Sequence, residues 1–319
     1  MGLLDDFKAG DLRALARIIT RIEDRRNGYQ DILAELYPRA GHALRVGITG
    51  PPGAGKSTLA FRLAELLSQR QKKVGVIAVD PTSPFTGGAL LGDRIRMQEL
   101  SSDPNIFIRS MATRGSTGGL AEATRDTALL LDAFGKEVVL IETVGVGQVE
   151  LDIARACDTV IVVFVPESGD AVQAMKAGLM EIADVFCLNK ADREGAERLI
   201  VELRSVLGMR RRTNTWDYPV VQTQAVNKVG IEDLWREVER HQEYRRHETP
   251  HHRRREIRIA DDLMTVIRAK VDRRLEKTLR DSERFDQAVR DIAAEKTTPY
   301  TAADLLLQAI SGSLAGPAK

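Results

Sequence analysis

Residues 44–69 read LRVGITGPPGAGKSTLAFRLAELLSQ, and this stretch decides the fold. An apolar run of strand type leads into the motif GxxxxGKS, and a helical pattern of leucines follows at once. A glycine-rich loop between a strand and a helix turns its N–H groups toward an anion, and the helix start adds a positive dipole. In such a P-loop, Lys56 is expected to reach the β- and γ-phosphates and Ser57 to bind Mg²⁺ through its hydroxyl. The stretch therefore predicts a site for a nucleoside triphosphate.

A second motif, NKAD at residues 189–192, predicts which base this site accepts. It ends an apolar strand pattern about 130 residues after the P-loop, within alternating strand and helix patterns. The Asp192 carboxylate can accept hydrogen bonds from the N1–H and N2 amino groups of guanine, while the stem of Lys190 covers the base face. Adenine has no such pair of donors, so a carboxylate facing it would stay unpaired. The motif predicts GTP over ATP.

The composition is that of a chain with one large core and smaller appended elements. Of the 319 residues, 43% are hydrophobic, and 47 basic residues nearly balance 46 acidic ones. The balance gives no net field that would favour nucleic acid or a membrane surface. Cys157 and Cys187 lie in apolar stretches and are expected to pack in the core. Without an apolar signal region or a run of transmembrane length, the sequence predicts a soluble, cytoplasmic protein with no nucleic-acid or membrane partner.

Apolar runs alternate with helical patterns along the chain, as in a doubly wound α/β sheet. Several runs are almost entirely Val, Ile and Leu, which is typical of parallel strands buried on both faces. Strands are expected at residues 45–49, 74–79, 106–109, 138–141, 159–165, 186–189 and 220–223. Helices are expected at residues 11–25, 56–69, 120–134, 171–180, 194–207, 231–244, 254–278, 282–295 and 301–310. The prediction is a mostly parallel P-loop GTPase domain at 41–247, with helical extensions at 1–40 and 248–319.

Acidic residues stand where predicted strands end, at the edge of the sheet that carries the P-loop. Asp80 opens the loop DPTSPFTGGALLGD, which also holds Asp93, and Glu142 ends the strand VVLIE. Mg²⁺ takes few protein carboxylates and keeps several waters, so these acids suit holding it directly or through water. Gly145 could bring its N–H to the γ-phosphate, which would make residues 143–150 sensitive to hydrolysis. The alternative is that the acids only make turns and caps.

The longer motifs resemble one family of GTPases. The segments are GPPGAGKST, DPTSPFTGGALLGDRIRM, ETVGVGQVE, VVFVPESGDAVQAMKAG and NKAD. They are similar to the MeaB/ArgK group, which includes the human protein of methylmalonic aciduria type A and belongs to the metallochaperone-related class of P-loop GTPases. The resemblance implies a chaperone that uses GTP to gate delivery of adenosylcobalamin to methylmalonyl-CoA mutase and to protect or reactivate that enzyme.

Carried over to this chain, the resemblance implies a set of nucleotide, magnesium and switch residues. The phosphate loop would be Gly50, Pro51, Pro52, Gly53, Ala54, Gly55, Lys56, Ser57 and Thr58. Asp80, Asp93 and Glu142 would surround Mg²⁺ together with Ser57, and Gln148 would lie in the second switch. Residues 166–176 resemble a third switch that relays the nucleotide state to the mutase. Asn189, Lys190 and Asp192 would read guanine, helped by Gln224, Ala225 and Val226, although Gln224 stands where serine is common. The C-terminal helices resemble a dimerisation arm, so a homodimer is expected.

Hydrolysis by the isolated chain is expected to be slow, because Gln148 lies three residues after Gly145 instead of directly after it. An arginine supplied by a partner is worth a factor of about 10³ to 10⁵ in such enzymes. Three other functions stay open: a nickel-insertion GTPase, a kinase or ATPase of basic amino-acid transport, and a scaffold whose nucleotide is structural. The small number of cysteines disfavours the first, NKAD disfavours the second, and an intact Lys56, Ser57 and Glu142 disfavour the third.

Overall fold

The computed structural model describes residues 2–80, 102–112, 117–143, 156–166, 179–209, 216–248, 251–280 and 282–314. The chain divides into two compact units, Met1–Arg255 and Glu256–Lys319. The first unit carries the sheet and all of the predicted nucleotide-binding residues that the structure describes.

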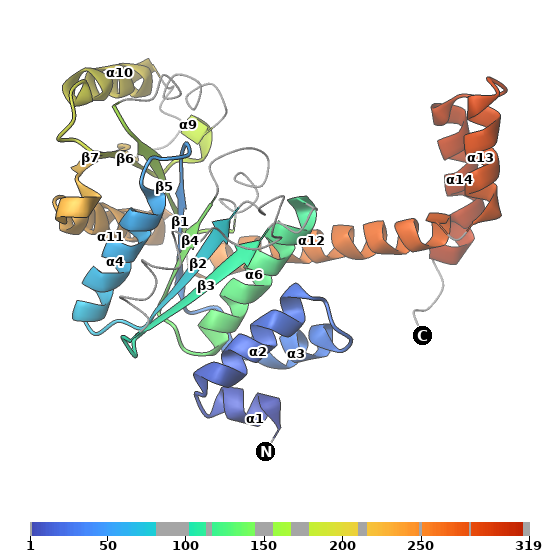
Figure 1. Ribbon diagram of the computed structural model, residues 1–319, viewed down its shortest axis with the longest axis horizontal. Helices are drawn as coiled ribbons and strands as arrows, with labels where there is room; N and C mark the ends of the chain where they lie inside the picture. The colour runs from blue at the N-terminus through green and yellow to red at the C-terminus, as the bar shows by residue number, and fades with distance from the viewer. Residues whose placement is uncertain are drawn as a thin grey trace. The chain divides into compact units, whose positions relative to one another are not determined.

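The first unit is built on a sheet of seven strands, all of them parallel (Figure 1). The strands are β1 (Leu44–Thr49), β2 (Val74–Asp80), β3 (Ile106–Ala112), β4 (Val138–Glu142), β5 (Thr159–Phe164), β6 (Val185–Asn189) and β7 (Val220–Thr223), in the spatial order β3-β2-β4-β1-β5-β6-β7. The order changes direction around β1, so the loop after β1 lies at the switch point where open α/β sheets bind ligands. The predicted doubly wound fold is confirmed.

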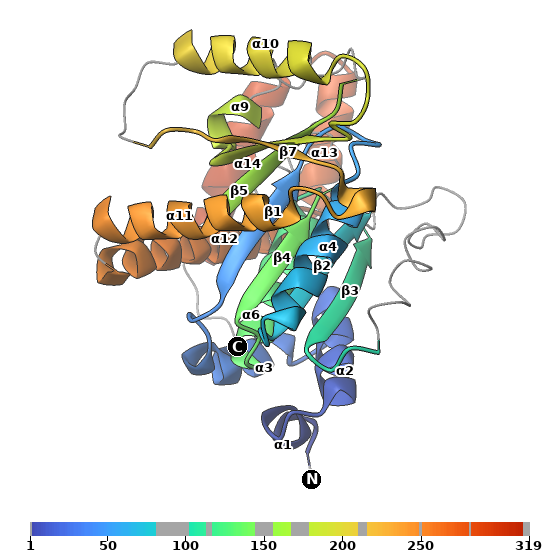
Figure 2. The same cartoon turned by 90° about the vertical axis from the view of Figure 1, so that its left-hand side faces the viewer.

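Helices cover both faces of this sheet. They are α4 (Lys56–Gln69), α6 (Thr117–Ala133), α9 (Leu179–Ile182), α10 (Ala196–Met209) and α11 (Ile231–Glu248), with short 3-10 turns at η1 (Tyr37–Arg39) and η2 (Ala225–Asn227). Figure 2 shows α4 and α11 over the face turned to the viewer. Of the helix expected at 171–180, only the end falls among the described residues, as the start of α9.

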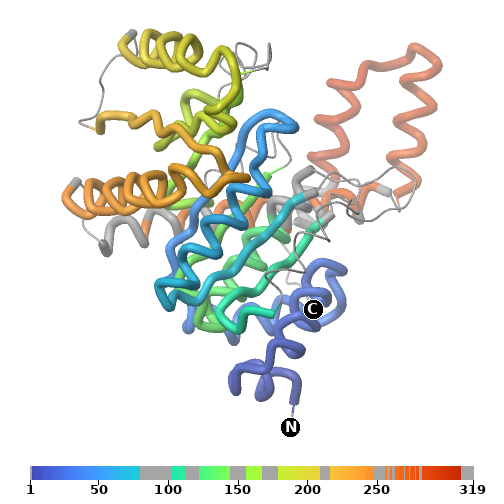
Figure 3. The backbone as a smooth tube through the Cα atoms, turned by 60° about the vertical axis from the view of Figure 1, so that its left-hand side comes forward, coloured from blue at the N-terminus to red at the C-terminus, as the bar shows by residue number. Residues whose placement is uncertain are grey.

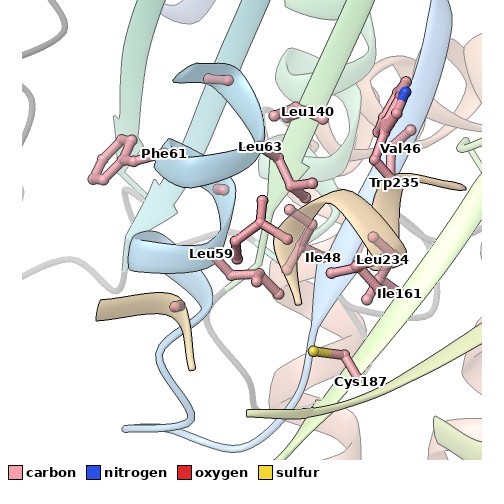
Figure 4. Close-up of a cluster of buried hydrophobic side chains, with 14 of the residues drawn as sticks. Val46, Ile48, Leu59, Phe61, Leu63, Leu140, Ile161, Cys187, Leu234 and Trp235 are labelled. Carbon is pink, nitrogen blue, oxygen red and sulfur yellow. The ribbon is translucent and has the colours of Figure 1, made fainter. Parts of the chain in front are cut away.

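The core under α4 and α11 explains why the strands read as apolar runs. Ile48 of β1, Leu59 of α4, Ile161 of β5 and Leu234 of α11 are all fully buried in one cluster (Figure 4). Successive side chains of a strand point to opposite faces of the sheet, and a core lies against each face, so most residues of a strand are apolar. Cys187 packs in this cluster, where burial raises the pKa of its thiol to about 12, so it is an inert core residue as predicted.

The N-terminal helices complete the opposite face of the sheet. They are α1 (Leu3–Lys8), α2 (Leu12–Glu23) and α3 (Tyr29–Leu36), drawn in dark blue at the bottom of Figure 3. Leu15, Ile18 and Ile19 of α2 are fully buried in one cluster with Leu131 of α6 and Ile141 of β4. These three helices share a core with the sheet.

The second unit consists of helices. Helix α12 (His251–Arg280) crosses the boundary between the units and is followed by α13 (Glu283–Ala293) and α14 (Pro299–Leu314). Several large apolar side chains of α12 are exposed, among them Ile259, Leu263, Ile267 and Val271, which recur at intervals of four residues. This spacing puts them on one face of the helix. No helix in the described part of the chain combines the length and apolar character needed to cross a membrane.

Candidate nucleotide-binding site

The loop after β1 has the backbone that a phosphate-binding loop requires. Gly50, Gly53 and Gly55 have φ values of 141°, 74° and 87°, a region that residues with a side chain rarely adopt. Space is limiting as well, because a Cβ on Gly50 would collide with the carbonyl oxygen of Val163. A Cβ on Gly55 would likewise collide with the side-chain amide of Asn189. Glycine is therefore required by both the dihedral angle and a close neighbour at Gly50 and Gly55, and by the dihedral angle alone at Gly53.

Lys56 begins α4 and turns back over this loop. Its Nζ donates hydrogen bonds to the carbonyl oxygens of Gly50 at 2.8 Å and Pro51 at 3.0 Å, and the side chain is buried. Few lysines are buried without compensation, and here backbone carbonyls provide it. The ammonium group is thereby held at the mouth of the loop, where it can reach an anion cradled by the backbone.

Ser57 and Glu142 meet beside the loop because β1 and β4 are neighbours. The register pairs Ile48 with Glu142, so the last residue of β4 lies next to the end of β1. The Ser57 hydroxyl donates to Oε1 of Glu142 at 2.5 Å, and Glu142 is 7% exposed. A hydroxyl and a carboxylate in contact at a sheet edge are hard oxygen donors of the kind Mg²⁺ prefers.

The other predicted magnesium ligands are placed only in part. Asp80 is the last residue of β2, at the same edge of the sheet as Glu142, and its side chain lies outside the described part of the structure. Asp93 also lies outside the described residues. Within the described residues, no group of three or more His, Cys, Asp or Glu side chains is arranged to hold a metal ion. The structure therefore joins Ser57 to Glu142, and the full set of four stays a prediction.

Asn189 connects the phosphate loop to the predicted base-binding loop. Its Nδ2 donates to the carbonyl oxygen of Ala54 at 2.9 Å. Its Oδ1 accepts from Thr223 Oγ1 at 3.1 Å and from the backbone N–H of Ala225 at 3.0 Å. The side chain is 3% exposed, so these three bonds satisfy a buried amide. One residue of the NKAD motif thus fixes two loops that follow different strands.

The rest of the NKAD motif forms a tight turn at the end of β6. Lys190 has φ of 55°, and its carbonyl oxygen accepts a hydrogen bond from the N–H of Arg193 at 3.0 Å. The N–H of Ala191 donates to the carbonyl oxygen of Thr223 at 3.1 Å, which ties the turn to β7. Asp192 is exposed at the tip of this turn. The turn leaves its carboxylate open to a ligand.

The loop after β7 is short and closed on itself. The N–H of Gln224 donates to the carbonyl oxygen of Val229 at 3.0 Å, and the N–H of Val229 donates back at 3.2 Å. Ala225 is buried, whereas Val226 is 75% exposed at the tip. The three predicted residues of this loop therefore differ in role: Gln224 closes the turn, Ala225 offers its N–H to Asn189, and Val226 faces solvent.

Sequence reasoning missed the ion-pair network that holds this loop on α4. Lys228 Nζ lies 2.6 Å from Glu65, and Arg62 lies 3.0 Å from the same carboxylate. Arg62 also donates to the carbonyl oxygen of Ala225 at 3.3 Å. Burial raises the pKa of Glu65, but the hydrogen bonds from Lys228 and Arg62 outweigh it and leave that pKa below its usual value. Arg62 and Glu65 are three residues apart on α4, but Lys228 and Ala225 lie 163 residues from the α4 residues that they contact, and no local pattern relates such distant positions.

Three predicted elements of the switches stay predictions. Gly145 and Gln148 lie outside the described residues. Of the segment 166–176, the structure describes only Pro166.

Comparison with known proteins identifies the family. The family model of methylmalonyl-CoA mutase-associated GTPases, MeaB, matches residues 15–280. A protein of Pyrococcus abyssi, whose name describes it as a GTPase, is 48% identical over 97% of this chain and 96% of its own length. The GTPase ArgK of Escherichia coli is 38% identical over 73% of this chain and 72% of its own.

Among solved structures, a LAO/AO transport system kinase is similar with a TM-score of 0.71 and 27% identity, over 97% of this chain and 96% of that one. The nearly complete overlap extends the likeness to both helical extensions. The predicted resemblance is thus confirmed by the family model and by curated relatives. Together with the P-loop and the NKAD turn described above, these matches show that the chain is a guanine-nucleotide-binding GTP hydrolase that belongs to the MeaB family of methylmalonyl-CoA mutase-associated GTPases.

Proposed function

We propose that this protein is a GTP-driven chaperone of an adenosylcobalamin-dependent acyl-CoA mutase, with methylmalonyl-CoA mutase as the favoured client. The observation that carries the proposal is the match of residues 15–280 to a family described by its association with that mutase. Hydrolysis of GTP to GDP and phosphate would gate delivery of the cofactor and protect or reactivate the enzyme.

In this proposal, the residues around the P-loop bind the phosphates and Mg²⁺. Lys56 would exchange its carbonyl partners for the β- and γ-phosphates, and the N–H groups of residues 53–58 would surround them. Ser57 and Glu142 would hold Mg²⁺, with Asp80 and Asp93 directly or through water. The ion, when bound, neutralises charge that develops on the phosphates. Gln148 would position the attacking water, and residues 166–176 would report the nucleotide state to the client.

Guanine would bind between the NKAD turn and the loop after β7. The open carboxylate of Asp192 supports this role, because it is free to accept the two donors of guanine. Asn189, the first residue of the NKAD turn, binds Ala225 of the loop after β7 and Ala54 of the phosphate loop, which preorganises the base pocket.

We further propose a homodimer formed through the C-terminal helices. The exposed apolar face of α12, which includes Ile259, Leu263, Ile267 and Val271, supports it. A repeated apolar face on a long helix is stabilised when a second helix covers it.

The test is GTP turnover by the isolated protein and with an adenosylcobalamin-dependent methylmalonyl-CoA mutase added, with ATP as the nucleotide control. We expect slow GTP hydrolysis that rises at least tenfold with the mutase, and no comparable use of ATP. The Lys56→Ala variant, added at the same concentration, controls for contaminating hydrolases. If the mutase leaves the rate unchanged and does not co-elute with the GTP-loaded protein, the client assignment is wrong.

Two alternatives give different results in related assays. A nickel chaperone would bind Ni²⁺ tightly; the absence of a three-ligand cluster in the described part of the chain disfavours it. A transport kinase would transfer phosphate from ATP to a protein or small molecule, and ³²P-labelled product would reveal that transfer.

A further inference from the structure

A basic pocket lies on the first unit between α2 and β3. It has a volume of about 540 Å³ and is lined by the arginines Arg17, Arg21, Arg26 and Arg109. This volume is within the range of pockets that bind small molecules. Nothing in the predicted nucleotide site uses these residues.

The pocket is separate from the nucleotide site. Arg109 lies on β3, and β2 and β4 stand between β3 and the strand that carries the P-loop. Phe107 and Met111, which share a face of β3 with Arg109, pack in the core beneath α2 and α6. Helix α4, with Lys56 at its start, covers the other face of the sheet. A ligand in this pocket would therefore bind on the opposite side of the sheet from α4.

Two of the arginines are fixed by acidic partners. Arg109 donates through Nε to Glu23 at 3.0 Å, makes a second short contact with the same carboxylate, and donates to Thr20 Oγ1 at 3.2 Å. Arg26 makes two hydrogen bonds to Asp24, at 2.8 and 3.2 Å. These pairs compensate the charges of two of the four arginines that line the pocket.

The other two arginines, Arg17 and Arg21, have no ion-pair partner in the part of the chain that the structure describes, and both line the pocket. They are four residues apart on α2, so they project from one face of the helix. Like charges in this arrangement destabilise a helix, and a bound anion would remove the repulsion. Guanidinium groups also match the oxygens of a phosphate with two parallel hydrogen bonds.

The remaining wall of the pocket is apolar. Leu3 of α1 and Ala16 of α2 contribute it, and the Thr20 hydroxyl is engaged with the carbonyl oxygen of Ala16 at 3.0 Å. A free inorganic anion would leave this wall in contact with water. The arrangement suits a ligand with a charged group at one end and an apolar or planar group at the other, which can also stack on a guanidinium plane.

We propose that this pocket binds an organic phosphate: a phosphate monoester whose phosphoryl group is held by Arg17 and Arg21 and whose apolar or planar part packs against Leu3 and Ala16. Arg109 and Thr20 also line the site. The proposal concerns a second ligand and does not depend on the identity of the client enzyme.

Calorimetry on the full-length protein tests this, with phenyl phosphate as the probe and with the P-loop filled beforehand by GDP and Mg²⁺. We expect saturable binding of one phenyl phosphate per chain, and weaker binding of inorganic phosphate and of phenol. The double variant R17Q/R21Q is expected to bind phenyl phosphate at least about tenfold more weakly, since each lost charged hydrogen bond is worth a factor of about ten or more.

The matched control is Arg13→Gln, which removes an exposed arginine of the same helix that does not line the pocket. It is expected to leave the affinity unchanged. Circular dichroism checks the folding of each variant, and the single variant Arg17→Gln replaces the double one if that variant unfolds. The proposal is overturned if phenyl phosphate does not bind, if R13Q weakens binding as much as R17Q/R21Q, or if inorganic phosphate binds equally well. The proposal is also overturned if an acidic peptide, tested as tetraglutamate, binds in the pocket and phenyl phosphate does not.

Discussion

Asn189 ties the phosphate loop to the loop after β7, and replacing it with alanine should loosen both. The change removes the hydrogen bonds to Ala54, Thr223 and Ala225. It also leaves the buried carbonyl oxygen of Ala54 and the N–H of Ala225 without this partner. At about 1 kcal/mol for each bond, the loss is about 3 kcal/mol in the free energy of unfolding.

Urea unfolding of the nucleotide-free protein measures this free energy, and a fluorescent GDP analogue measures nucleotide affinity. We expect N189A to lose about 3 kcal/mol of stability and to bind GDP at least about tenfold more weakly, because both loops that form the predicted site lose their common anchor. Tight binding of GDP by a variant as stable as the wild type would refute the reasoning.

Two further variants separate the contributions of this side chain. Asn189→Asp keeps an acceptor for Thr223 and Ala225 but places a carboxylate oxygen against the carbonyl oxygen of Ala54. It should therefore weaken the affinity for inorganic pyrophosphate, which needs the phosphate loop alone. Asn227→Ala is the control, since Asn227 is exposed on the same loop and its side chain bonds only to Gln224 among the residues that the structure describes. It should change stability by less than about 0.5 kcal/mol.

Three other changes have defined outcomes. Glu142→Gln keeps the hydrogen bond to Ser57 but removes a charge, so the Mg²⁺ concentration for half-maximal GTP turnover should rise at least about tenfold, and an unchanged requirement would argue against a metal-binding role. Gly230→Ala forces a side chain into a φ of 75° and against the carbonyl oxygen of Gln222, so calorimetry should show weaker GDP binding with pyrophosphate binding intact; equal loss of both would contradict a local effect on the base loop. Burial, and to a smaller extent the charge of Arg245, lowers the pKa of His241 to about 3. Below about pH 6.5 the unfolded state therefore binds more protons than the folded state, and the free energy of unfolding decreases as the pH is lowered. When urea unfolding is measured at pH 7.5 and at pH 5.5, the free energy of unfolding should drop by about 1.4 kcal/mol more for the wild type than for His241→Gln. Parallel pH profiles would show that His241 does not titrate on unfolding.

His241 illustrates how a buried network sets a protonation state. Gln242 donates to Thr159 Oγ1 at 2.6 Å, so the hydroxyl hydrogen of Thr159 is available to the ring nitrogen Nδ1 of His241 at 2.9 Å. The proton of the neutral ring then resides on Nε2, which lies 3.3 Å from Asp184. The carboxylate of Asp184 favours the charged form of the ring. The side chain of His241 is only 5% exposed, however, and the effect of this burial is larger, so the ring stays neutral.

The sequence predicted the sheet well because its strands are buried on both faces and read as apolar runs. The boundaries that were missed have local causes. The helix expected from residue 194 begins at Ala196, since Gly195 has φ of 89°, outside the helical region. Strand β3 runs to Ala112 instead of 109 because it stays paired with β2 as far as Asp80.

Motif reasoning named the residues of the candidate site but did not indicate how they are held. The P-loop and NKAD are local patterns, and local patterns carry the geometry of a turn. That Asn189 anchors Ala54 depends on β1 and β6 being separated only by β5, which the strand order determines. The roles of Arg62, Lys228 and the arginine pocket also depend on contacts between distant parts of the chain, and periodicity does not encode these.

The shared core of α2 and the sheet has a consequence for synthesis on the ribosome. Leu15, Ile18 and Ile19 are translated about 120 residues before their partner Ile141, which takes on the order of ten seconds at cellular rates. Until then, strand β4 is not available to cover the apolar face of α2. The nascent chain must pass through this interval with an amphipathic helix exposed, which makes the first helices of this protein a natural binding target for chaperones that act during translation.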